Sequence, residues 1–278
     1  MITCNLMGGL GNQIFQIFAT IAYSIKSRNK FQFLAQETLG GGGCTLRYTF
    51  WNSFFLKLKP FLIHSLPPIN VIRENGFAFQ ELPVHSMIGT NVLIHGYFQS
   101  EKYFKEHYDM ISRLIGLENL KQSVLNTLGL KKEDLINTIS MHFRLGDYKK
   151  LQDFHPIATQ QYYENALNHF KSAFPENFKI LYFCEDEDAN EVLATIQNLE
   201  NKFPNYEFTR GANTLADWEQ MLYMSLCRHN IIANSSFSWW GAYFNSNKEK
   251  VVCYPSVWFG NNMDTRDLCP ETWIKMNC

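Results

Sequence analysis

The stretch ISMHFRLGDY, residues 139–148, decides the fold of the second half of the chain. It begins with apolar and β-branched residues and ends in polar groups around a glycine, which predicts a buried strand over 138–145. Because side chains alternate along a strand, His142 and Arg144 should face one side of a sheet and Phe143 the other. The polar loop then follows the carboxyl end of the strand, where open α/β sheets bind ligands.

Arg144 has two interpretations at such a strand end. Its guanidinium is a planar fork of donors that suits a phosphate. Alternatively, it forms a structural loop clamp by pairing with Asp147. The stretch alone does not separate these two roles.

Composition narrows the class of protein. With 278 residues, 46% hydrophobic and 18% charged, the chain is long and apolar enough for one large folded domain or two ordinary ones. A formal net charge of −1 gives no electrostatic footprint for nucleic acid or an acidic membrane. We therefore expect no nucleic-acid partner.

The seven cysteines are scattered and include no C-x-x-C pair, which favours reduced thiols and a reducing compartment. Met1 is followed at once by a predicted strand, so no signal peptide is expected. No uncharged apolar run reaches the roughly 18 residues that a transmembrane helix needs. These features predict a cytoplasmic protein with at most peripheral membrane association.

The first half opens with a predicted strand over 2–6, a glycine turn and a helix whose apolar residues recur at helical spacing. The turn has three interpretations: a nucleotide-phosphate site, a tight packing turn, or a polar lip to a cleft formed by Asn12 and Gln13. Its glycine spacing does not match the NAD(P) fingerprint. Residues 36–90 are irregular, and a strand over 92–98 then leads through the loop that carries Tyr97 to a helix over 101–117.

The second half alternates strands and helices, which predicts a parallel sheet covered on both faces. A polar, lysine-rich bridge over 118–137 separates the halves, so we expect two domains, 1–125 and 126–278. The predicted strands are 138–145, 179–184, 205–209, 231–235 and 250–254, and the predicted helices are 159–174, 188–203, 214–229 and a short one from Ser236.

Three strand ends of this second half should converge at one edge of the sheet. Beside His142 and Arg144, the segment 234–238 (NSSFS) places hydroxyls at a helix start, where free N–H groups and the helix dipole favour an anion. Taken alone, Ser235 and Ser236 are better explained by an ordinary serine N-cap. Together with Arg144, they favour a pyrophosphate site.

The third strand end is acidic, residues 185–188. Asp186 and Asp188 have the spacing of a D-x-D metal site, but acidic residues are also favoured at a helix start. A third interpretation makes Asp186 the carboxylate that accepts from a nucleobase N–H.

Four motifs then occur in order: GGLGNQ at 8–13, GYFQSEKYF at 96–104, HFRLGDY at 142–148 and NSSFSWWGA at 234–242. In these motifs the chain closely resembles the α1,2-fucosyltransferase family, from Met7 to about Trp258. The resemblance implies an α/β, GT-B-like fold of two Rossmann-like domains facing across a cleft. It implies an inverting glycosyltransferase that moves L-fucose from GDP-β-L-fucose to a hydroxyl, by family default O2 of a terminal β-galactoside, with no metal or other cofactor.

The resemblance also assigns residues. It implies that the phosphates are bound by Arg144, that the guanosine lies near His142 and that guanine is read by Asp186. It implies that the donor phosphates and fucose contact Asn234, Ser235, Ser236 and Phe237, and that the reacting groups lie near Asn12. For the cleft or acceptor we expect Gln13, Tyr97 and His155, and for a base Asp147 or His155. Partners are therefore GDP-fucose and a glycan acceptor.

One departure from the family pattern concerns Leu145, which stands where the family has a second arginine. By strand alternation Leu145 points away from Arg144, so phosphate binding should survive. Two alternative functions are kept: a nucleotide-sugar transferase of another donor specificity and an NAD(P)-binding Rossmann oxidoreductase.

Overall fold

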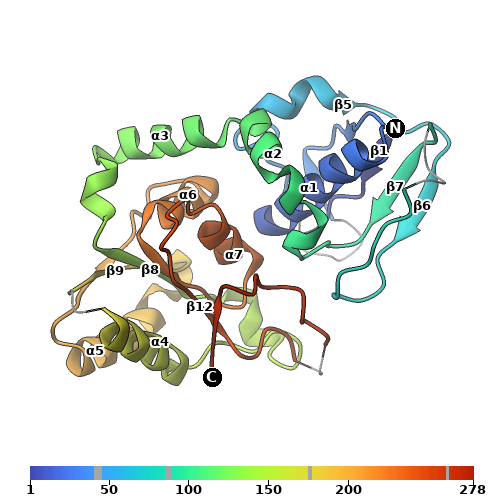
Figure 1. Ribbon diagram of the computed structural model, residues 1–278. Coiled ribbons are helices and arrows are strands. Elements are labelled where there is room, and N and C mark those ends of the chain that lie inside the picture. Colours follow the sequence, from blue (N-terminus) through green and yellow to red (C-terminus); the bar gives the residue numbers. More distant parts are fainter. Residues whose placement is uncertain (41–45, 85–88, 175–176, 261–262) are drawn as a thin grey trace. The chain divides into compact units, whose positions relative to one another are not determined.

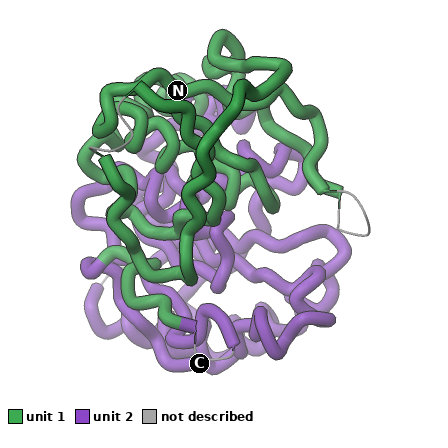
Figure 2. The backbone as a smooth tube through the Cα atoms, turned by 90° about the vertical axis from the view of Figure 1, so that its right-hand side faces the viewer, with its two compact units in different colours: residues 1–120, 264–270 green, residues 121–263, 271–278 purple. Residues whose placement is uncertain are grey.

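The computed structural model describes residues 1–40, 46–84, 89–174, 177–260 and 263–278. It divides into two compact units, coloured separately in Figure 2. Unit 1 contains residues 1–120 and 264–270, and unit 2 contains residues 121–263 and 271–278. The sequence placed the boundary at 125/126; in the structure the division falls earlier in the same helix, between residues 120 and 121, and a late segment joins unit 1.

Contacts of Asp267 explain why this late segment belongs to unit 1. One carboxylate oxygen of Asp267 accepts from the backbone N–H of Phe79 at 3.0 Å. The other forms an ion pair with Lys102 at 2.5 Å. Such long-range partners cannot be inferred from local patterns, because nothing in the sequence around 264–270 indicates them.

Unit 1 is built on the parallel three-stranded sheet β1-β7-β6 and the long helix α1. The apolar residues of α1 are buried, as their helical spacing predicts.

The predicted helix over 101–117 is broken instead, because Phe104 leaves the helical conformation and Gly116 adopts a left-handed one (φ 73°) that ends α2. The elements are β1 (Ile2–Cys4), α1 (Leu10–Lys26), β2 (Phe33–Leu34), β3 (Thr38–Leu39), β4 (Arg47–Tyr48), the 3₁₀ turn η1 (Leu56–Phe61), β5 (Leu62–Ile63), β6 (Asn70–Arg73), β7 (Val92–His95), η3 (Glu101–Tyr103), η4 (Lys105–His107), α2 (Tyr108–Ile115) and α3 (Leu117–Leu128), which runs on into unit 2.

Unit 2 is a doubly wound α/β domain. Its six strands are all parallel in the order β10-β9-β8-β11-β12-β13, with α4 and α5 on one face and α6 and α7 on the other (Figure 1). In chain order this is 3-2-1-4-5-6, the Rossmann order. The elements are η5 (Lys132–Leu135), β8 (Thr138–His142), η6 (Gly146–Lys150), α4 (Gln160–Ala173), β9 (Lys179–Phe183), η7 (Asp186–Asp188), α5 (Ala189–Lys202), β10 (Glu207–Arg210), α6 (Asp217–Leu226), β11 (His229–Ile231), α7 (Ser236–Tyr243), β12 (Val252–Pro255) and β13 (Ile274–Met276).

Strand β8 alternates as predicted. Phe143 and Leu145, just beyond its end, lie in the core that packs under α4 and α5. The ring of His142 instead lies 5.5 Å from that of Phe237 on α7. The strand stops at His142, earlier than expected, because the backbone turns at Leu145 (φ −112°, ψ −84°) into the 3₁₀ turn η6.

Two tyrosines of α4 hold the strand ends. The hydroxyl of Tyr163 donates to the backbone oxygen of His142 at 3.0 Å. The hydroxyl of Tyr162 donates to the backbone oxygens of Ile232 at 2.5 Å and Cys253 at 3.0 Å. Both tyrosines are fully buried, so α4 holds the carboxyl ends of β8 and β11 and the first half of β12.

The six cysteines of the described residues are free thiols, and Cys44 lies outside those residues. Among the helices that the structure describes, none combines the length and apolar character that a bilayer crossing requires.

Candidate active site

The order of the strands in unit 2 locates a ligand crevice. The chain proceeds in one direction from β8 to β9 and β10, and in the other from β11 to β12 and β13, so the switch point falls between β8 and β11. In doubly wound sheets, ligands bind outside the carboxyl ends of the strands at this point. The segments that follow these two strands are those that carry Arg144 and Ser235.

Arg144 forms ion pairs with two carboxylates, Asp147 and Glu185. Its guanidinium also lies 5.1 Å from the ring centre of Tyr148. Burial acts to lower the pKa of Arg144, but the two carboxylates outweigh it and the net shift is upward. Arg144 is therefore a preorganised cation at the strand end. The ion pair between Arg144 and Asp147 that the sequence suggested is present. Glu185 is a second partner of Arg144 that the sequence did not indicate.

Asp188 stabilises the loop that carries Arg144. This carboxylate is 3% exposed; it accepts from the backbone N–H of Gly146 at 2.7 Å and pairs with Lys149 at 2.8 Å. Asp186 points to other partners, Arg210 at 2.6 Å and Asn213 at 3.4 Å. The two aspartates of the D-x-D spacing thus serve different partners.

His142, at the end of β8, has a neutral imidazole. Burial, followed by the charge of Arg144, lowers the pKa of His142 to about 3. Its Nδ1 is buried and has no hydrogen-bond partner among the described residues. A neutral histidine has one donor and one acceptor nitrogen, so His142 retains hydrogen-bonding capacity for a ligand.

The second side of the crevice is the start of α7. Ser235 is the N-cap, and its side chain accepts from the backbone N–H of Phe237 at 3.3 Å. Asn234 is buried, and its amide donates to the backbone oxygens of Pro156 at 2.7 Å and Trp258 at 3.0 Å. Ser236 and Phe237 are partly exposed. Asn234 therefore fixes the backbone of this strand end, and the next residues begin the helix.

The loop after β8 meets the same strand end. The hydroxyl of Tyr148 donates to the backbone oxygen of Asn234 at 3.1 Å, and its ring stacks on that of His155 with centres 4.4 Å apart. Burial lowers the pKa of His155. Unit 2 therefore brings together His142, Arg144, Asp147, His155 and Asn234–Phe237, with Asp186 at the end of the neighbouring strand.

Unit 1 carries its own polar strand ends. Asn12 is partly exposed near the start of α1, and its Oδ1 accepts from Nε2 of Gln99 at 2.9 Å. Gly8 has a positive φ of 74°, and a Cβ there would lie 2.4 Å from Nδ2 of Asn12, so the turn needs glycine. Tyr97 is partly exposed and its ring stacks on Phe77.

Gln13 departs from the expected cleft position. It is fully buried, and its amide donates to the backbone oxygens of Gly8 at 3.0 Å and Tyr48 at 2.9 Å. Helical periodicity turns position 13 inward beside the apolar face of α1, so Gln13 supports the turn from inside the unit.

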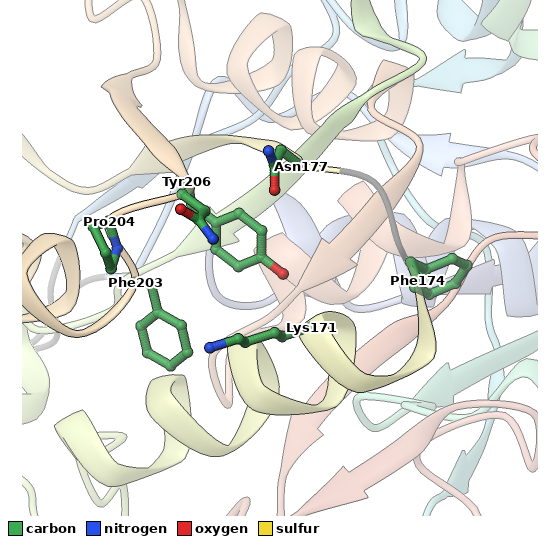
Figure 3. A pocket seen from close by; sticks show the side chains of 7 residues that line it. Lys171, Phe174, Asn177, Phe203, Pro204 and Tyr206 are labelled. Atoms are coloured by element: carbon green, nitrogen blue, oxygen red, sulfur yellow. The ribbon is translucent and has the colours of Figure 1, made fainter.

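A separate pocket of about 170 Å³ lies at the other edge of the sheet in unit 2 (Figure 3). Its lining comes from the ends of α4 and α5 and from the segments that precede β9 and β10, and it includes Lys171, Asn177, Phe203 and Tyr206. These segments enter the amino ends of the strands. The pocket is therefore distinct from the switch-point crevice.

The described residues contain no group of three or more His, Cys, Asp or Glu side chains that could hold a metal ion. The expectation of a metal-independent enzyme stays a prediction.

The strand order defines unit 2 as a Rossmann-type α/β domain. At its switch point lie a neutral histidine, an oriented arginine and a helix start, which together form a candidate anion site. Residues 50–277 match glycosyl transferase family 11. The chain therefore belongs to this family and is a glycosyltransferase, which confirms the resemblance seen in its motifs.

Two curated relatives and one solved structure show what the chain is similar to. It is 25% identical to an alpha-1,2-colitosyltransferase of Escherichia coli, with 99% of each chain covered. It is 32% identical to the O-antigen biosynthesis glycosyltransferase WbnK of Escherichia coli over 65% of this chain and 59% of the relative. A mutant of Arabidopsis thaliana FUT1 in complex with GDP has a TM-score of 0.52 and 10% identity, covering 97% of this chain and 74% of that one. This likeness confirms the α/β, GT-B-like fold class.

Proposed function

We propose that the protein transfers L-fucose from GDP-β-L-fucose to a sugar hydroxyl with inversion, forming an α1,2 linkage, with O2 of a terminal β-galactoside as the expected acceptor. The observation that carries this proposal is the meeting of Arg144 and the start of α7 at the switch point of a Rossmann sheet. Such a site suits the diphosphate of a nucleotide sugar.

The chemistry follows from where charge develops. The oxygen of the acceptor hydroxyl forms a bond to the anomeric carbon, and the bond from that carbon to the β-phosphate oxygen breaks, with its electrons leaving on GDP. Arg144, which its two ion pairs already orient, and the free N–H groups at the start of α7 stabilise this negative charge. Removing one such preorganised donor typically costs about 10²–10³ in rate.

The proton of the acceptor hydroxyl has two candidate destinations. Asp147 is already paired with Arg144, which gives it a role in orienting the guanidinium. His155 has a pKa lowered by burial, so it is neutral at pH 7 and able to accept a proton. A strongly dissociative transition state would need little help from either.

A second donor is favoured by a specific observation. The relative that matches over 99% of both chains is a colitosyltransferase. Colitose is L-fucose without its 3-hydroxyl, so a site for one sugar needs little change to accept the other. GDP-colitose is therefore the alternative donor, and NAD(P) oxidoreduction has no comparable support.

The test combines a binding panel with a matched pair of variants. Thermal shifts with GDP-fucose, GDP-colitose, GDP-mannose, UDP-sugars and NADP should show stabilisation by GDP compounds. Arg144→Ala should abolish this stabilisation and lower kcat by about 10²–10³, whereas Arg144→Lys, which keeps the charge without the fork, should lose less.

Near wild-type turnover in Arg144→Ala would remove the phosphate role. Stabilisation by NADP alone would support the oxidoreductase instead. Product linkage analysis on an acceptor array tests the α1,2 assignment.

A further inference from the structure

The loop after β7, residues 96–100, is built around one half-buried carboxylate, that of Glu74. Oε2 of Glu74 accepts the backbone N–H groups of Tyr97 at 2.7 Å and Phe98 at 2.9 Å. The hydroxyl of Tyr103 donates to Oε1 of Glu74 at 3.3 Å. Phe98 has a left-handed backbone (φ 52°) and is fully buried. A non-glycine residue is held in this conformation only where its surroundings enforce it, so the loop has a fixed shape.

The fixed loop delivers Gln99 to Asn12. Gln99 is 7% exposed, and its Nε2 donates to Oδ1 of Asn12 at 2.9 Å. Its own Oε1 is buried and has no hydrogen-bond partner in the part of the chain that the structure describes. A buried amide oxygen without a partner destabilises the folded chain, so an arrangement of this kind calls for a functional explanation.

The bond from Gln99 decides what Asn12 offers to a ligand. An asparagine amide has a donor side and an acceptor side, and its orientation is set by its partner. With Oδ1 occupied by Gln99, the partly exposed Asn12 has its N–H groups left to donate. The absence of a side chain at Gly8 makes the space for Nδ2 in this orientation.

We propose that Gln99 is a positioning residue that fixes the amide of Asn12, so that Asn12 presents N–H donors rather than a carbonyl oxygen to the reacting groups. This inference rests on the proposed function and on the family resemblance, which implies that Asn12 lies near those groups. Negative charge develops on the leaving diphosphate, and a donor stabilises it whereas a carbonyl oxygen repels it.

Three substitutions separate orientation from packing. Gln99→Glu keeps the shape but can only accept, so it turns the amide of Asn12 around. Asn12→Asp accepts from Gln99 and presents a carboxylate oxygen. Both should lower kcat by about 10²–10³. Gln99→Met fills the same volume and leaves Asn12 free to rotate, so its loss should be roughly fivefold, the equivalent of one hydrogen bond of about 1 kcal/mol.

The readouts are kcat and KM for sugar transfer, the thermal shift with GDP, and the melting midpoint of each variant. The inference requires kcat to fall in the order Gln99→Met, then Gln99→Glu close to Asn12→Asp, independently of the melting midpoints, while Gln99→Met and Gln99→Glu still bind GDP. Gln36→Glu, at an exposed glutamine of the same unit, is the matched charge control and should be fully active.

If Gln99→Glu melts early, Asn12→Asp, which leaves Gln99 in place, provides the comparison. If the wild-type chain transfers the sugar and Gln99→Glu is equally active, the role of Gln99 is overturned while the proposed function stands. No transfer by the wild-type chain from any GDP-sugar would overturn the proposed function and this inference together.

Discussion

At the scale of single residues, Arg144 is engaged before any donor arrives. Asp147 and Glu185 pair with it, and the side chain of Arg144 is 17% exposed whereas the two carboxylates are each 44% exposed. An incoming phosphate competes with these two carboxylates for the guanidinium. The pairing therefore keeps Arg144 oriented at a cost to phosphate affinity.

Glu185→Gln should tighten GDP binding. The substitution removes one competing charge from Arg144 and leaves Asp147 to hold it. Partly exposed ion pairs contribute about 1 kcal/mol or less, so the expected gain is up to roughly fivefold in Kd by calorimetry. Glu187→Gln removes the same charge from an exposed position in the same loop and should not change Kd. Weaker GDP binding in Glu185→Gln would mean that Glu185 contributes to phosphate binding by orienting Arg144.

At the scale of elements, buried polar groups join the strands to their helices. In unit 2, Nδ2 of Asn230 on β11 donates to Oγ of Ser140 on β8 at 2.7 Å and to the backbone oxygen of Met224 on α6 at 2.9 Å. His229, beside it, accepts the backbone N–H of Val251 through Nδ1 at 3.0 Å. Its ring lies among phenylalanines at the end of α4 and before β9.

His229 should make the protein less stable in mild acid. Burial, followed by the charge of Arg228, lowers the pKa of His229 to about 4 from an ordinary value near 6.5. Between these values the unfolded chain binds more protons than the folded one, so the free energy of unfolding falls as the pH is lowered. The limiting slope is about 1.4 kcal/mol per pH unit for one group.

His229→Asn should flatten this dependence in denaturant titrations between pH 6.5 and 4, whatever its effect at pH 7. His142, whose pKa is lowered to about 3, contributes in the same direction, so part of the slope should remain. His64→Asn, on an exposed side chain of unit 1, is the control for removing a histidine. An unchanged slope in His229→Asn would show that this ring does not remain neutral in the folded state.

At the scale of the whole molecule, the carboxyl ends and the amino ends of the parallel strands in unit 2 carry different side chains. The carboxyl edge carries the arginine, the neutral histidine and the helix start, whereas the pocket of Figure 3 lies at the amino edge. Topology explains the difference, since a switch point opens a crevice only beyond the carboxyl ends of the strands.

GDP should therefore slow hydrogen exchange in residues 142–148 and 234–238. Segments 177–179 and 204–207, at the amino edge of the same sheet, are the internal control and should exchange as in the free protein. Exchange measured by mass spectrometry with and without GDP gives both results at once. Protection at the amino edge alone would move the nucleotide site to that pocket.

Local patterns predicted much of this molecule. The alternation of strands and helices in 138–255 predicted five of the six strands of the parallel sheet in unit 2, because hydrophobic periodicity is a local property, and missed β13 at 274–276. Alternation along β8 also placed His142 and Leu145 on opposite faces, and Leu145 is buried in the core. The predicted ends of helices and strands were displaced by a few residues: α6 ends at Leu226 and β11 begins at His229, both earlier than the patterns indicated.

The sequence by itself determined the fold class, the family and the strand ends that carry polar residues, because each of these is written in contiguous residues. Tertiary structure alone decided how those residues are held. It paired Arg144 with Glu185, fastened Gly146 to Asp188, buried Gln13, and brought Gln99 to Asn12. Each of these contacts joins residues from different elements or depends on burial, and their geometry exists only once the strands have paired and the helices have packed.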